Sequence, residues 1–129
     1  MKNQIVPLLE YAESAIRQER NFVKNSNEIS KEYQSYISSF GASVMQSGLL
    51  PALYFNHNTE SQSAKDRKKL MNVIYKTLQE KYRILHHNVP QERDLLEYAK
   101  NHPDLRKLQK EILDAATAVK LVIRTYKLI

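Results

Sequence analysis

The stretch ISKEYQSYISSFGASVMQSGLLPALYF, residues 29–55, carries the most regular helical pattern in the sequence. Its apolar side chains recur at three- and four-residue steps, which places them on one face of an amphipathic helix. These side chains are Ile29, Tyr33, Tyr36, Ile37, Phe40, Val44 and Met45. Gly48 is suited to end this helix with a positive φ, and Pro51 can open a further short helix that ends at Asn56. The stretch therefore predicts two consecutive helices.

Patterns of the same period cover most of the remaining chain, and Pro, Asn and Ser residues mark the breaks between them. No segment alternates polar and apolar residues as a half-buried strand does. The sequence therefore predicts an all-α protein, a single compact bundle of about five to six helices formed by residues 1–129. Asn25 and Glu28 could cap the first of the two helices above. Four further helices are expected, from about Val6 to Val23, from a cap at Ser63 to Leu85, from 90 to 100 and from about Asp104 to Leu128. In the second of these four, Asp66 lies near the start and Leu85 faces inward.

The composition limits the class of protein. The chain has 129 residues, the length of one domain, and no Cys, so disulfides and thiolate metal sites are excluded. Its first 20 residues contain no long apolar run of the kind found in signal peptides or membrane spans, so we expect a cytoplasmic protein. Lys and Arg number 20 against 14 Asp and Glu, a formal charge of +6. That excess indicates either a polyanionic partner or a soluble basic surface, and composition does not separate the two.

The sequence offers no catalytic or metal-binding motif. His57, His86, His87 and His102 stand near expected helix ends or in loops, and none lies in a His-x-x-x-His or His-Glu-x-x-His pattern. The carboxylates lie on expected helix surfaces beside Lys and Arg, and two Gly cannot form a phosphate-binding loop. We therefore expect a protein that is not an enzyme and that has no catalytic residue, cofactor or metal.

Basic residues cluster near the ends of the expected helices. Each group could hold phosphates by Coulomb attraction and counterion release, whereas a solvated helix face is the alternative for any one of them. Tyr54 and Phe55 could offer bases a stacking surface, although packing in the core or at an interface is favoured. The groups are Lys65, Arg67, Lys68 and Lys69 early in the fourth helix, Arg106, Lys107 and Lys110 early in the last, and Arg17, Arg20 and Arg124 late in the first and last helices.

The opening stretch also resembles a known family. Residues 46–55, QSGLLPALYF, resemble an n-G-L-x-x-[TA]-L-x-F segment that follows an aliphatic helix in the small subunits of type III-B CRISPR effector complexes, the Cmr assemblies. RDLLEYAK at 93–100 and VIRTYK at 122–127 stand where those subunits have a d-L-L-e-y-l segment and a basic and aromatic ending. LLEYAESAI at 8–16 is similar to their first helix. The order and spacing of these motifs extend the resemblance over nearly the whole chain.

The resemblance implies a noncatalytic subunit that stacks with copies of itself and with other Cmr subunits, faces guide and target RNA, and has no membrane partner. On this hypothesis the basic residues above contact the RNA backbone, the first two groups most strongly. The uncharged segment of residues 43–55 is then a tight junction that packs helices, in preference to a contact between subunits; its structural motif is Gly48, Leu49, Leu53 and Phe55. A DNA-binding transcription regulator with a helix in the major groove and a protein-only adaptor are alternatives, and a hydrolytic enzyme comes last.

Overall fold

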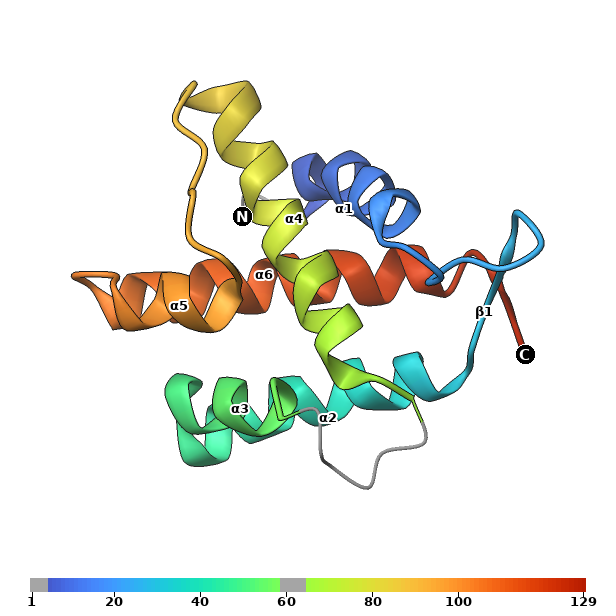
Figure 1. Cartoon of the computed structure of the whole chain (residues 1–129), viewed down its shortest axis with the longest axis horizontal. Helices are drawn as coiled ribbons and strands as arrows, with labels where there is room; N and C mark the ends of the chain where they lie inside the picture. Colours follow the sequence, from blue (N-terminus) through green and yellow to red (C-terminus); the bar gives the residue numbers. More distant parts are fainter. Residues whose placement is uncertain (1–4, 59–64) are drawn as a thin grey trace.

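The computed structural model describes residues 5–58 and 65–129, and almost all of their regular secondary structure is helical (Figure 1). In chain order these are α1 (Val6–Gln18), α2 (Glu32–Ser47), α3 (Leu49–Asn56), α4 (Arg67–Leu85), α5 (Leu95–Lys100) and α6 (Leu105–Ile123). Two very short strands, β1 (Glu28–Ile29) and β2 (Lys127–Leu128), accompany them. The predicted all-α fold of five to six helices is confirmed, whereas the expectation that no strand forms is wrong for these two segments.

Helix α6 runs through the middle of the molecule, with α1 on one side and α2 and α3 on the other, and α4 crosses α6 from the side of α2 and α3 to the side of α1 (Figure 1). The inward faces meet in one hydrophobic core, in which Ile16, Leu70, Ile74, Leu108 and Ile112 are fully buried. Burying each such side chain favours folding by about 1.5–3 kcal/mol relative to leaving it exposed. The amphipathic stripes of the sequence are therefore the source of the packing.

The strands join the end of the chain to the segment that precedes α2. They pair in parallel, and the Ile129 N–H donates to the Ile29 carbonyl at 3.0 Å while the Lys31 N–H donates to the Ile129 carbonyl at 2.9 Å. This pairing explains why α6 ends at Ile123 and not at Leu128 as expected. Leaving the helix gives the backbone of the last residues partners in a distant segment, so their hydrogen bonds remain satisfied.

The boundaries of the first two helices also differ from expectation. Helix α1 ends at Gln18, well before Val23, because the chain turns at Asn21, whose φ is +62°, and inserts Phe22 into the core. The Phe22 ring packs on Tyr33 with centroids 4.5 Å apart. Helix α2 begins at Glu32 rather than near residue 29, because Glu28 and Ile29 pair with β2.

Asn25 does not cap α2 as expected. It has a φ of +52° within the turn before β1, and its side-chain amide donates to the Glu28 carboxylate at 2.6 Å. The cap expected at Ser63 lies outside the described residues, and Asp66 caps α4 instead, its carboxylate accepting the Lys68 N–H at 3.0 Å. At the other end of α4, Leu85 is 55 % exposed and does not face the core as predicted.

Gly48 forms the junction between α2 and α3. Its φ of +97° and ψ of +163° lie in a region open mainly to glycine, and α3 begins directly after it at Leu49, two residues before Pro51. Leu49 and Leu53 are buried, but Phe55 is half exposed on the opposite side of the helix. The uncharged segment therefore has one packed face and one open face. At the end of α2, Met45 also lies outside the core.

Candidate nucleic-acid interface

The start of α4 gathers cations from three segments of the chain. Lys24, Lys65 and Lys69 line a hollow of about 410 Å³, together with Asn21, Ser30, Tyr33 and Asp66. Lys65 and Lys69 are among the cations predicted from the sequence to bind RNA, whereas Lys24 is not. The turns at residues 21–26, which no helical period reveals, bring Lys24 to this place. The hollow is thus lined by three positive charges and one carboxylate.

The predicted cations in the first turn of α4 are also tied into the fold. The Arg67 guanidinium lies 3.9 Å from the centroid of the Tyr36 ring and 5.1 Å from that of Phe55. The Tyr36 hydroxyl accepts the Lys65 backbone N–H at 3.0 Å. Lys69 donates to the carbonyl oxygen of Arg20 at 3.0 Å, which places a second predicted arginine next to this group. These cations therefore serve the packing of α4 whether or not they bind a ligand.

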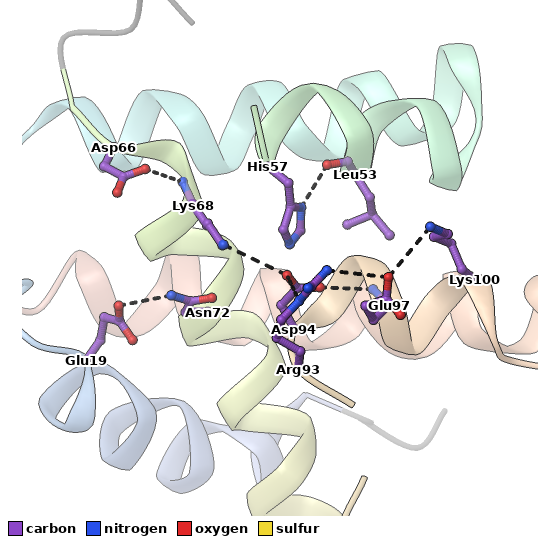
Figure 2. Close-up of polar contacts among 10 residues, drawn as sticks. All are labelled: Glu19, Leu53, His57, Asp66, Lys68, Asn72, Arg93, Asp94, Glu97 and Lys100. Carbon is purple, nitrogen blue, oxygen red and sulfur yellow. Dashed lines mark hydrogen bonds and ion pairs between the residues drawn. The ribbon is translucent and has the colours of Figure 1, made fainter. Parts of the chain in front are cut away.

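Lys68 faces the opposite way, toward a buried carboxylate (Figure 2). Its Nζ lies 3.9 Å from Asp94, which is only 6 % exposed and also lies 3.6 Å from the Arg93 Nε. Burial by itself raises the pKa of Asp94, but the N–H donated by Glu97 at 3.0 Å and the cations around it lower that pKa overall. Asp94 is therefore ionised and holds Lys68 away from the hollow.

His57 completes this buried group at the end of α3. Its Nδ1 donates to the Leu53 carbonyl oxygen at 2.8 Å, because a carbonyl oxygen can only accept. Figure 2 shows the ring directed from α3 toward Asp94. Burial lowers the pKa of His57, with Lys68 acting in the same direction and the Leu53 carbonyl and Asp94 against it. Among the described residues, Nε2 has no hydrogen-bond partner.

The start of α6 presents cations in a different setting. Asp104 caps the helix by accepting the Lys107 N–H at 3.1 Å. The side chains of Arg106 and Lys107 are exposed and form no ion pair or hydrogen bond with any described residue. Lys110, one turn later, pairs with Asp114 at 3.2 Å. Two of the three predicted cations are thus free to meet a ligand.

The three arginines predicted late in the first and last helices lie in different places. Arg17 contacts Glu13 at 3.1 Å, donates to the Ser26 carbonyl at 3.0 Å and lies 5.2 Å from the centroid of the Tyr126 ring. It therefore joins α1 to two other segments. Arg124 is exposed at the end of α6, while Arg20 belongs with the start of α4.

Residues 5–58 and 65–129 contain no cluster of three or more His, Asp or Glu side chains that could hold a metal ion. Within the same ranges, none of the helices is long and apolar enough to cross a membrane. The interfaces described above consist of cations, aromatic rings and carboxylates engaged in caps or ion pairs. Such an arrangement suits the binding of an extended anion.

Comparison with known proteins gives one finding. The family model described as CRISPR-associated protein (Cas_Cmr5) matches residues 9–125, which includes every described helix from α2 to α6 and most of α1. Neither a curated protein nor a solved structure matches the chain. Because the match extends over nearly the whole sequence, the predicted resemblance to the Cmr small subunits is confirmed. The chain belongs to the Cas_Cmr5 family and is a small subunit of a Cmr, type III-B, CRISPR-associated complex.

Proposed function

We propose that this subunit is noncatalytic and binds the sugar–phosphate backbone of guide and target RNA through the cations at the starts of α4 and α6. The observation that carries the proposal is the pair Arg106 and Lys107, exposed and without an ion-pair partner among the described residues. Cations in the first turn of a helix oppose its dipole at a cost of about 0.3–1 kcal/mol each. Their position is unfavourable for the helix and favourable for holding a phosphate.

The hollow at the start of α4 gives the second contact. Lys24, Lys65 and Lys69 line it, so a phosphate placed there meets charge from the start of α4 and from the turn that follows α1. Neutralising a phosphate releases counterions, and several such contacts in series give an affinity that depends steeply on salt. Sequence recognition then comes from pairing between guide and target, so the protein needs no base-reading helix.

The proposal includes stacking of copies within a cytoplasmic complex. Leu9, Glu10, Glu13, Leu121, Val122 and Thr125 line a hollow of about 300 Å³ between α1 and α6. Exposed Val6 and Leu121 add apolar surface at these helices. A neighbouring subunit that covers this area would remove apolar surface from water. We expect Leu121→Glu to leave the monomer folded and to reduce sedimenting oligomers or incorporation into the Cmr complex.

The decisive experiment measures the affinity for a single-stranded RNA 20-mer at several salt concentrations. We compare the wild type with Arg106→Ala/Lys107→Ala and with Lys81→Ala/Arg83→Ala, a control that removes the same charge at the far end of α4. Loss of two phosphate contacts should weaken binding and make the salt dependence shallower, reducing the magnitude of the slope of log K against log salt by about 1.4. The control should change neither beyond the general effect of net charge.

Equal slopes for all three proteins would contradict the assignment of Arg106 and Lys107. Absence of any salt-dependent RNA binding would favour a protein-only adaptor. Sequence-dependent binding to duplex DNA would favour a transcription regulator. Purification of the tagged subunit from its native cells, with sequencing of bound RNA, tests the complex itself, because guide RNAs should share a repeat-derived 5′ end.

A further inference from the structure

Helix α3 shows two chemically different faces. Leu49, Ala52, Leu53 and Asn56 are buried, and they attach the helix to the rest of the molecule. Tyr54 and Phe55 are each 53 % exposed, and Pro51 is exposed one turn earlier. Together these three side chains form a contiguous exposed apolar surface, and such surfaces are typical of binding sites.

Cations from three other helices flank this exposed face. At its start, Arg106 of α6 shares a hollow of about 380 Å³ with Leu49, Leu50 and Pro51. Further along, the Lys100 Nζ of α5 lies 5.9 Å from the centroid of the Tyr54 ring, and at the end the Arg67 guanidinium lies 5.1 Å from that of Phe55. Positive charge therefore accompanies the whole length of α3.

Two of these cations, Arg67 and Lys100, are held by contacts with other residues. Arg67 is held on the other side by the Tyr36 ring at 3.9 Å, and Lys100 is placed by Glu97 at 3.6 Å. Tyr36 itself is buried in the core. The cations next to Phe55 and Tyr54 are thus positioned before any ligand arrives, which lowers the entropic cost of binding one.

The rings of Tyr54 and Phe55, with cations beside them, suit a ligand that carries flat apolar groups and regularly spaced negative charges. Unpaired nucleic acid has both, because each base offers a π-face and each nucleotide a phosphate. A duplex buries the faces of its bases and would meet only the cations. An acidic peptide would supply charge but not a regular series of stacking faces.

We propose that Phe55 and Tyr54 stack against unpaired bases of an RNA strand whose phosphates lie against Arg67, Lys100 and Arg106. This inference rests on the proposed RNA-binding function and extends it from the backbone to the bases. It also predicts a preference that backbone contacts alone do not give, namely for single-stranded over double-stranded RNA at this surface.

The experiment uses the full chain with fluorescently labelled single-stranded 12-mers of uridine or adenosine and an RNA duplex of the same length. Phe55→Leu keeps an apolar side chain next to Arg67 but removes the flat ring, whereas Phe55→Tyr keeps the ring. We expect Phe55→Leu to weaken binding of both single strands by on the order of tenfold. The salt slope and the affinity for the duplex should not change, and Phe55→Tyr should bind as the wild type does.

Ile84→Ala, at an exposed apolar residue of the far end of α4, is the matched control and should have no effect. Wild-type affinity in Phe55→Leu would overturn the stacking inference while leaving the backbone proposal intact. Equal weakening toward single strands and duplex would also overturn it, since the effect would then come from displaced cations. Loss of capture of other Cmr subunits with unchanged RNA affinity would assign the face to protein. If the wild type shows no salt-dependent RNA binding, the proposed function fails first.

Discussion

Helices α4 and α6 begin alike in sequence, with an Asp cap followed by two or three cations, yet they begin differently in space. At α4 the cations meet an aromatic ring, a buried carboxylate and a backbone carbonyl, through Arg67, Lys68 and Lys69 respectively. At α6 the side chains of Arg106 and Lys107 meet no partner among the described residues. The same pattern therefore gives cations that stabilise the fold in one place and cations available to a ligand in the other.

This difference separates two consequences of removing a charge. Removing a cation at the start of α4 should cost stability as well as affinity, whereas removing Arg106 or Lys107 at the start of α6 should cost affinity alone. Experiments that measure only RNA binding would confuse the two. The free energy of unfolding has to be measured on the same variants.

The largest difference is expected between two capping carboxylates. Asp94→Ala removes the cap of α5 and the buried partner of Lys68, so we expect the free energy of unfolding to fall by about 2 kcal/mol or more. Asp104→Ala removes only an exposed cap, a loss of about 1 kcal/mol. Urea unfolding followed by circular dichroism measures both. Equal losses would show that the buried setting of Asp94 adds nothing.

A smaller difference is expected between two arginines. Arg67→Ala removes a guanidinium from the face of Tyr36, which should cost about 0.5–2 kcal/mol of the free energy of unfolding. Arg106→Ala should stay within about 0.5 kcal/mol of the wild type, as exposed substitutions usually do. The midpoints of urea unfolding at constant m-value test this. A destabilised Arg106→Ala would mean that the start of α6 is also structural.

The smallest expected effect is on how the free energy of unfolding changes with pH, through His57. Because burial lowers the pKa of His57 in the folded protein, the unfolded chain binds more protons just below the ordinary His value of about 6.5. The stability that the neutral imidazole gives is complete above that pH and is lost as the pH falls from there toward the lowered pKa. His57→Asn keeps an N–H for the Leu53 carbonyl but cannot titrate, so its unfolding free energy should fall less between pH 7 and pH 5.

Asp94 contributes in a separate window, since its lowered pKa gives stability that is present above its unfolded value and lost only at lower pH. A variant lacking His57 should therefore still unfold in stronger acid. The two windows can be compared by thermal unfolding at intervals of pH. An unchanged acid profile in His57→Asn would remove His57 from this group.

Sequence reasoning located most helices because their stability comes from stripes of apolar side chains that repeat with the helical period. It failed at the ends of α1 and α6, where distant contacts replace helical hydrogen bonds. Phe22 leaves α1 to pack on Tyr33, and the last residues leave α6 to pair with β1. No local propensity in those segments indicates either partner.

The candidate interface was predicted in part for the same reason. The basic residues are visible in the sequence, but Lys24 joins Lys65 and Lys69 only through the turns that follow α1. Likewise, the division of α3 into a buried and an exposed face depends on how Gly48 sets its direction. The segment is uniformly uncharged in sequence, but in the structure it has one buried face and one exposed face.

By itself the sequence determined the helical class, the positive charge and membership of the Cmr small subunits, because these depend on composition, period and the order of motifs. Only the tertiary structure decided which cations are engaged and which are free. Lys68 and Asp94, for example, are far apart in the chain and form an ion pair. They are brought together by the packing of the core, which local sequence does not specify. That decision separates the cations that hold α4 from those that α6 offers to a ligand.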